Sequence, residues 1–361
     1  MGDLGSEIDS FAKTRRRTVR PQAYGKVIHP KKPRLSQVAA AAFCIFMITL
    51  PATAPAIIGS PAGSASRADH LRVRVAVVKP VFTATAYSSF YGFYSKYANT
   101  PKGQQIRSDL EKLNATIVDG WGWSDGLRQF INSRAASRNG MVLGKSLTIL
   151  TDISVTEGQL FDDKGVNRFD VVILGFTEYV TSQQYSGYKH FVENGGRLVF
   201  LDATNFLAEV KYHSHSHHLS LVMGHGWGFD GKKVWRDVFE RWGEQNKNWI
   251  ASNYCCGTYS RYDGAITNGT HPISLALKEH FGSRVFKTYG GHEENQVTNM
   301  TGTTILARWV QASPGQHDLV AAYLHRYLNG TVIHIGVMGS DVISFDQSVQ
   351  FFLIRSVLEP N

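Results

Sequence analysis

Apolar residues between positions 72 and 202 occur in short continuous runs that alternate with amphipathic stretches. The runs predict strands over residues 72–79, 115–120, 146–152, 168–175 and 197–202. The stretches between them predict helices over residues 101–113, 125–137 and 182–194. Gly195-Gly196 marks the end of the last helix, because glycine readily adopts the left-handed conformation that closes a helix. Buried strands alternating with helices are typical of βα units, so we expect a parallel sheet with helices on both faces.

Beyond residue 202 the pattern is less regular. Residues 206–233 are polar and rich in His and Gly, and they read as a loop. A short helix is predicted after His271-Pro272, a hairpin over residues 325–336 with Asn329-Gly330 as its turn, and an amphipathic helix over residues 345–358. No internal repeat is evident. We interpret residues 71–361 as one elaborated α/β domain.

The charge and hydropathy of the first 70 residues indicate export. The net charge is +9, and residues 1–37 hold nine Lys/Arg against three acidic residues, so most of the excess belongs to a basic tail. We see no basic face on the remaining chain, and we expect no nucleic-acid partner. An apolar segment follows at residues 38–58, close to the ~20 residues that span a bilayer. A polar linker occupies residues 59–70.

Two interpretations of this segment stay open. Residues 38–58 are either an uncleaved signal-anchor, with the basic tail in the cytoplasm, or a signal peptide cleaved after Ala54. The first predicts a membrane-anchored protein with an extracytoplasmic domain, and the second predicts a secreted one. Four Asn-x-Thr sequons agree with either; they begin at Asn114, Asn268, Asn299 and Asn329.

Polar residues follow the predicted parallel strands, at the edge where ligands bind in sheets of this class. These residues are Asp152, Glu178, Tyr179 and Asp202. Glu178 is a candidate acid/base, and Tyr179 a candidate metal ligand, since a cation lowers the pKa of a phenol. Alternatively, Glu178 caps the next helix and Tyr179 packs in the core. Asp152 and Asp202 are catalytic candidates or helix N-caps.

The stretch from residue 169 to 206 carries a family resemblance. It contains a strand, a Glu-Tyr turn, a helix, Gly-Gly, a strand and an Asn-containing loop. In this order they resemble the glutamine-amidotransferase-like domain in the large subunit of N,N-dimethylformamidase. The segments "THPISLAL" and "NGTVIHIGV" look like the wider group, which includes trehalose-utilisation-type proteins. The resemblance implies a flavodoxin-like, mostly parallel sheet, and amide hydrolysis at a mononuclear iron held by tyrosines and a glutamate, with Tyr179 as a ligand.

Histidines provide a second candidate metal site. His213, His215 and His217 would share one face of an extended chain, and His225 follows nearby. This density suits zinc or copper, but a solvated Ser/His loop and a pH-sensing role remain as alternatives. His292 and Glu293 lie in a Gly-rich stretch and could complete a metal or acid/base site.

The cysteines argue against thiol chemistry. Class I amidotransferases carry a Cys nucleophile in the turn after a strand, and the corresponding turn here, residues 175–179, has none. Cys255 and Cys256 are adjacent, which would strain a bond between them.

We therefore expect an exported, metal-dependent hydrolase of C–N bonds in a small substrate, not a Cys-dependent glutaminase. The main alternative is a non-catalytic cell-surface module that binds a ligand, and a weaker one is a carbohydrate-related protein. The sequence does not indicate an oligomeric state.

Overall fold

The computed structural model describes ten segments of the chain. They are residues 73–88, 92–93, 114–225, 240–258, 263–266, 270–282, 285–287, 292–309, 319–336 and 339–358. For residues 255–258, 263–266, 285–287, 292–295 and 319 it describes the backbone only. All of them belong to the unit Ala65–Asn361. Within them no helix is long and apolar enough to cross a membrane. The predicted export segment, the linker and the helix predicted over residues 101–113 lie outside the described residues.

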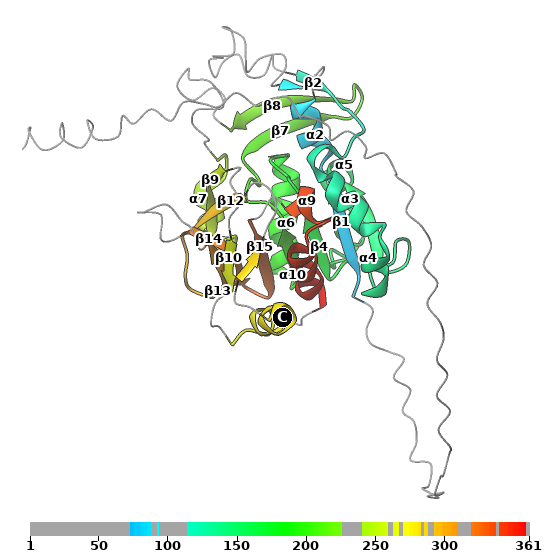
Figure 1. The fold of residues 1–361 in the computed structure, drawn as a ribbon. Coiled ribbons are helices and arrows are strands. Elements are labelled where there is room, and N and C mark those ends of the chain that lie inside the picture. Colours follow the sequence, from blue (N-terminus) through cyan, green and yellow to red (C-terminus); the bar gives the residue numbers. More distant parts are fainter. Residues whose placement is uncertain are drawn as a thin grey trace, which may run out of the picture. The chain divides into compact units, whose positions relative to one another are not determined.

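Five parallel strands form the centre of the main sheet (Figure 1). In spatial order they are β3 (Leu147–Thr151), β1 (Val75–Lys79), β4 (Val171–Leu174), β6 (Arg197–Phe200) and β15 (Gly330–Ile335). All four pairings between them are parallel. The predicted α/β class and parallel sheet are confirmed for this centre.

The same sheet continues beyond β15 with antiparallel strands, of which the sequence pattern predicted only the β14–β15 hairpin. The strands are β14 (Leu319–Tyr327), β13 (Thr303–Trp309), β10 (Asp263–Ile266) and β11 (Val285–Lys287), with β12 (His292–Val297) and β9 (Ser252–Thr258) off this path. β15 thus lies between a parallel and an antiparallel neighbour.

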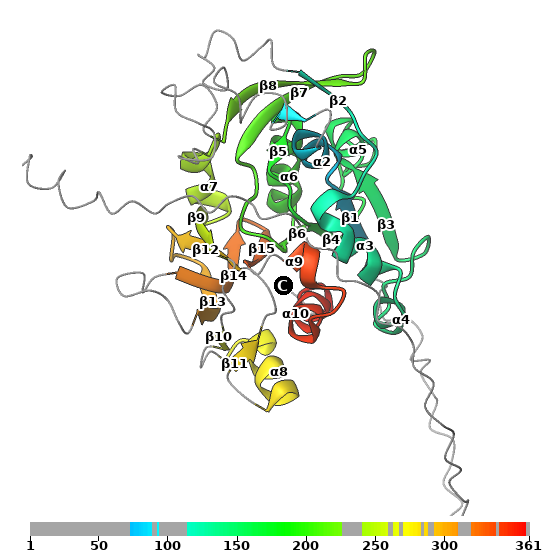
Figure 2. The same cartoon turned by 45° about the horizontal axis from the view of Figure 1, so that its top comes forward.

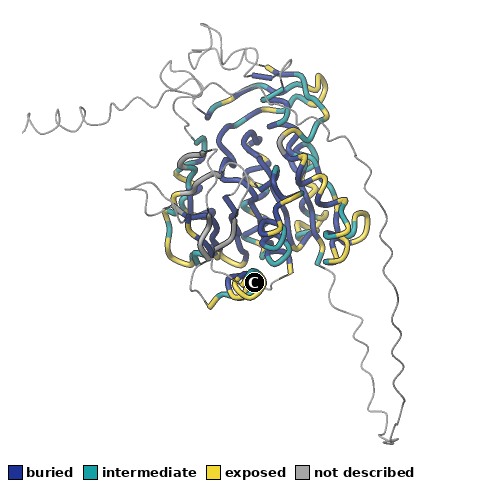
Figure 3. Tube along the Cα trace, in the orientation of Figure 1, coloured by how far each residue is buried: buried dark blue, intermediate teal, exposed yellow. Residues whose placement is uncertain are grey.

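Helices cover both faces of the sheet because strand residues alternate between two cores. Val75 and Val77 pack in one core and Ala76 and Val78 in the other. The first core includes residues of α3 (Asp125–Ile131), α4 (Arg134–Arg138), α8 (Pro272–Phe281), α9 (Gly339–Val342) and α10 (Gln347–Leu358). The second includes residues of α5 (Asp152–Thr156), α6 (Ser182–Glu193) and α7 (Gly243–Trp249). Figure 3 shows the buried residues concentrated in this centre.

A second sheet of four strands lies at the top of the view in Figures 1 and 2. Its order is β2 (Asn114–Thr116), β8 (His218–Gly224), β7 (Ala208–His213) and β5 (Tyr179–Val180). A third core joins this sheet to helix α2 (Val81–Tyr87), and the short helix η4 (Gly122–Ser124) lies nearby. The chain passes from the main sheet to the second one at residues 175–178, directly before Tyr179.

The structure corrects three local predictions. The helix predicted over residues 125–137 is two helices, because Ser133 caps a new one. The stretch predicted as a polar loop contains the β7–β8 hairpin. The turn of the β14–β15 hairpin is Leu328-Asn329, since Gly330 already pairs with Tyr327. A Cβ at Gly330 would lie 2.1 Å from the carbonyl oxygen of Val192, so this glycine is needed for close packing on α6.

Candidate active site

The turn after β4 is strained and held by side chains. Phe176 has a φ of 47°, which is costly for a residue with a Cβ. Its N–H donates to Asp202 Oδ2 at 2.8 Å, and the N–H of Thr177 donates to Asn205 Oδ1 at 3.2 Å. The sequence placed Asp202 at the end of a strand, and its buried carboxylate serves here to hold this turn.

The next two N–H groups share one acceptor. Glu178 N and Tyr179 N donate to Thr83 Oγ1 at 3.0 and 3.2 Å. Thr83 lies on α2, so this hydroxyl joins the helix to the start of β5. Every backbone N–H from Phe176 to Tyr179 is thus bound by a side-chain oxygen.

Three polar side chains converge beside this turn. Tyr87 Oη donates to Glu178 Oε2 at 2.5 Å and lies 3.1 Å from His225 Nε2. His225 Nε2 lies 3.3 Å from the same Glu178 oxygen. The phenol proton points to the carboxylate, so His225 needs a proton on Nε2 to bond to either oxygen. Glu178 and His225 are only 2% and 4% exposed, so water screens the interaction between the two side chains little.

Aromatic rings surround this triad. Tyr179 stacks on His225 with ring centroids 5.8 Å apart, and it meets Tyr87 edge-on at 6.0 Å. Phe93 also packs against Tyr179, with ring centroids 6.1 Å apart. The sequence singled out Tyr179 as the ligand, but the tyrosine hydroxyl that contacts Glu178 belongs to Tyr87.

His225 owes its position to the end of β8. It has a φ of 53°, and its N–H donates to the carbonyl oxygen of Leu207 at 3.1 Å. The preceding Gly224 has a φ of 107°, and a Cβ there would lie 2.3 Å from the same carbonyl oxygen. Glycine is therefore required for the chain to bring His225 to Glu178.

A pocket of about 170 Å³ lies beside the triad, and Tyr87 is the triad residue that lines it. No charged side chain lines it; its walls are Pro80, Thr83, Ala84, Tyr87, Ser88, Trp121, Gly122 and Phe176. A space of this size and polarity suits a small, uncharged molecule.

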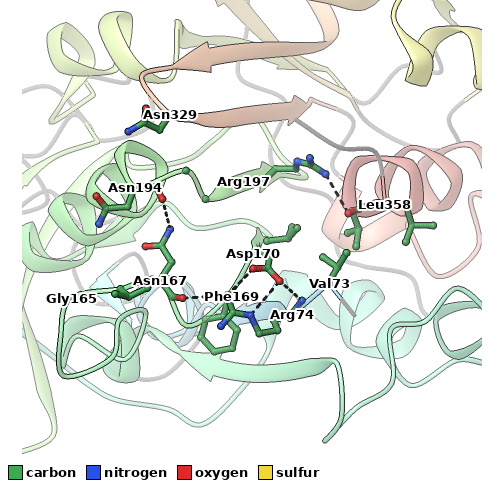
Figure 4. A pocket seen from close by; sticks show the side chains of 15 residues that line it. Val73, Arg74, Gly165, Asn167, Phe169, Asp170, Asn194, Arg197, Asn329 and Leu358 are labelled. Carbon is green, nitrogen blue, oxygen red and sulfur yellow. Dashed lines mark hydrogen bonds and ion pairs between the residues drawn. The ribbon is translucent and has the colours of Figure 1, made fainter. Parts of the chain in front are cut away.

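A larger pocket of about 760 Å³ lies at the opposite edge of the sheet, where the parallel strands begin (Figure 4). Arg74 and Asp170 form an ion pair of 2.7 Å there, and Arg197 donates to the carbonyl oxygen of Ser356. Its charged groups are thus engaged with the protein. None of the predicted site residues lines either pocket, but the smaller one is lined by Tyr87, which contacts Glu178, so the smaller pocket is the candidate site.

Asp152, a catalytic candidate from the sequence, is the first residue of α5 and is fully buried. Its side chain contacts the first turn of α2. Its Oδ2 accepts the N–H of Phe82 at 2.7 Å, and its Oδ1 accepts Gln184 Nε2 at 2.8 Å. It caps the helix that ends at Tyr87, about 9 Å further along the axis. Burial raises the pKa of Asp152 to about 7, against the opposing effect of these hydrogen bonds and of one from the Val81 N–H.

This shift predicts a pH dependence of stability. The folded pKa lies above the ordinary value of 3.8, so the folded state binds the proton more tightly. The stabilisation of the folded state by protonated Asp152 is fully present below about pH 4 and is lost as the pH rises through about 7. We therefore compare the free energies of unfolding of the wild type and of Asp152→Asn. The wild-type value minus the variant value should decrease by about 4 kcal/mol between pH 4 and pH 8. Denaturant titrations measure it, and a difference independent of pH would contradict the prediction.

The remaining predicted ligands do not join the triad. His213 ends β7 and bonds to Ser220 Oγ at 2.9 Å, while His215 and His217 are exposed in the hairpin turn. The extended run that would have aligned them is absent, because the chain reverses between residues 213 and 218. His292 and Glu293 lie in β12 and Cys255 and Cys256 in β9, where only the backbone is described. Across the described side chains, no group of three His, Cys, Asp or Glu residues is placed to hold a metal.

A metal site that includes tyrosine does fit the triad. Its donor atoms are a phenol oxygen, a carboxylate oxygen and an imidazole nitrogen, separated by 2.5–3.3 Å. Donors about 2.0–2.2 Å from one metal ion lie about 2.8–3.6 Å from each other, so the two distances to His225 fit directly and the phenol and carboxylate oxygens would move apart by a few tenths of an ångström. Oxygen and imidazole donors of this kind suit iron or zinc.

Comparison with known proteins gives the family. No curated sequence matches the chain. Among solved structures, a putative ThuA-like protein from Bacteroides uniformis is 11% identical, with a TM-score of 0.43 over 83% of this chain and 96% of the other. A cold-adapted β-galactosidase from Rahnella sp. is 11% identical, with a TM-score of 0.45 over 80% of this chain. The chain spans about a third of the length of that enzyme, 32%.

The model of one protein family matches most of the sequence. The match covers residues 44–340, so it includes every residue of the triad and of the turn that holds it. The predicted kinship to dimethylformamidase is confirmed. The chain belongs to the family described as N,N-dimethylformamidase beta subunit-like, C-terminal.

Proposed function

We propose that the protein hydrolyses a C–N bond in a small, uncharged amide, and that Tyr87, Glu178 and His225 form its active site. The observation that carries the proposal is the convergence of these three side chains within 3.3 Å, with Glu178 and His225 buried and Tyr87 lining a pocket without charged walls. Family membership supports the reaction class. The pocket volume of about 170 Å³ supports a substrate of few atoms.

Each side chain has a role that its contacts support. Glu178 accepts a proton from the attacking water, as a buried carboxylate near two donors can. His225 Nε2 delivers its proton to the leaving nitrogen and then takes the proton that Glu178 received, so both side chains return to their starting states. Tyr87 holds the carboxylate in place through its hydroxyl. A metal ion bound by the same three side chains would supply Lewis-acid polarisation of the amide carbonyl.

We further propose that the parallel centre is flavodoxin-like. Numbered along the chain, the five strands lie in the order 2-1-3-4-5, which is the order of that fold. The triad then lies beyond the carboxyl end of β4, where sheets of this order bind ligands.

One observation favours a non-catalytic alternative. The backbone N–H groups of residues 176–179 are all bound by side chains, so they are not open to a substrate oxygen. A module that only binds a ligand would have no need of such donors. Under this alternative the pocket retains its ligand, and no amide is cleaved.

A pair of tyrosine variants tests the proposal. Tyr87→Phe removes the hydroxyl that contacts Glu178, whereas Tyr179→Phe removes the one that the sequence favoured as a ligand. We expect Tyr87→Phe to lower amide turnover about 100-fold, and to lower the content of any iron or zinc that copurifies with untagged protein. Amine release and elemental analysis measure these effects. A larger loss in Tyr179→Phe, or no turnover by the wild type on any small amide, would refute it.

A further inference from the structure

The hydroxyl of Thr83 is in an unusual position, because it accepts two hydrogen bonds. Its Oγ1 takes the N–H groups of both Glu178 and Tyr179. A threonine oxygen has two lone pairs and one proton. Both lone pairs are therefore used, and the proton remains for a third partner.

That proton has no acceptor in the described parts of the chain, where both hydrogen bonds of Thr83 Oγ1 are accepted ones. Thr83 is only 2% exposed, so bulk water does not reach it freely. A buried donor without a partner costs about 1–3 kcal/mol. Its neighbour Thr85 is equally buried, but its Oγ1 accepts a single N–H, from Val118.

Among the described residues no acceptor meets this proton, and the space that adjoins Thr83 is the pocket. Thr83 lines it together with Tyr87 of the triad and Phe176 of the strained turn. We propose that the Thr83 hydroxyl donates a hydrogen bond to the carbonyl oxygen of a neutral ligand bound in this pocket. Thr83 is then a further catalytic residue, and this inference rests on the proposed hydrolysis.

In this arrangement the backbone N–H groups do not donate to the ligand themselves. They donate to Thr83 Oγ1, and the Thr83 hydroxyl donates to the ligand. The two N–H groups of the turn bind the Thr83 oxygen and withdraw electron density from it, which strengthens the O–H as a donor. The Thr83 hydroxyl, and not a backbone N–H group, then stabilises the negative charge that develops on the amide oxygen. Loss of one such donor in an enzyme lowers the rate about 100–1,000-fold.

Three variants separate this role from a structural one. Thr83→Ser keeps the hydroxyl, and Thr83→Val keeps the shape without it. Thr85→Val is the control on the same helix, because it also removes a buried hydroxyl that accepts a backbone N–H, that of Val118, but Thr85 does not line the pocket. If Thr83→Val does not fold, Thr83→Cys replaces it with a weak thiol donor.

The first readout is the infrared C=O stretch of ¹³C-labelled acetamide bound to Glu178→Gln protein, in which turnover is blocked. We expect the stretch to lie at low frequency with Thr83 or Ser, and to rise with Val or Cys. The second readout is kcat/KM for amide hydrolysis, which should fall about 100-fold in Thr83→Val and stay near the wild-type value in Thr83→Ser and Thr85→Val.

The outcomes separate the two proposals. Equal frequencies in the Thr83→Val and Thr83→Ser proteins, or no binding of acetamide, would overturn the hydrogen bond even if the wild type cleaves amides. Absence of amide cleavage by the wild type would overturn the proposed hydrolysis, and a stretch that depends on Thr83 would still support the hydrogen bond.

Discussion

Replacing Glu178 by Gln is expected to lower kcat/KM for amide hydrolysis about 1,000-fold. Gln keeps the size of the side chain and an oxygen for the Tyr87 hydroxyl, but it cannot take a proton from water. The substitution also removes the negative charge that faces His225 Nε2 at 3.3 Å. Release of amine from a small amide measures the loss.

The control is Glu157→Gln, which removes a carboxylate from the exposed end of α5. It should leave kcat/KM unchanged. Thermal unfolding of both variants checks that each is folded. If folded Glu178→Gln keeps wild-type turnover, then Glu178 is not the base and the triad does not perform the reaction.

Asp202→Ala is expected to lower the free energy of unfolding by about 3 kcal/mol. The substitution removes the charged acceptor of the Phe176 N–H, and that group has no access to water. The strained φ of Phe176 is maintained by such contacts, so the turn should relax and turnover should fall as well. Denaturant titration measures the change in stability.

Asp162→Ala is a matched control for this effect. Asp162 Oδ1 accepts two backbone N–H groups, from Lys164 and Val166, but in an exposed turn where water can replace it. We expect a loss below about 1 kcal/mol there. Equal losses in the two variants would show that burial of the Asp202 contact contributes nothing.

The centre of the fold was predictable because its strands are buried on both faces. Such strands give continuous apolar runs, and β1, β4 and β6 lie inside the predicted ones. The β7–β8 hairpin was missed because its turn consists of Ser and His. In β7 the alternation of buried Ala208 and Val210 with more exposed residues is too short to stand out beside them. The prediction of Asn329-Gly330 as the hairpin turn was wrong by one residue. Gly330 already pairs in β15, and it is needed for close packing on α6.

The site was predictable only in part. Glu178 could be singled out because it follows a recognisable strand, and His225 because it belongs to a cluster of histidines. Tyr87 lies 91 positions before Glu178 in a stretch with several tyrosines, so nothing local marks it. The available signal was its position shortly after the first predicted strand, where it ends helix α2. The role of Thr83 depends on contacts between α2 and β5, which no spacing encodes.

The place of β15 in the sheet has a consequence for how the chain folds. β15 pairs with β6 in a register that joins Thr331 to Arg197, 134 positions earlier, and it also pairs with β14. During synthesis, β6 therefore keeps one open apolar edge until almost the whole chain has emerged. Contacts between such distant residues slow folding, and open edges favour aggregation. Nascent chains that end before residue 330 should thus depend on chaperones, since they lack an interior strand.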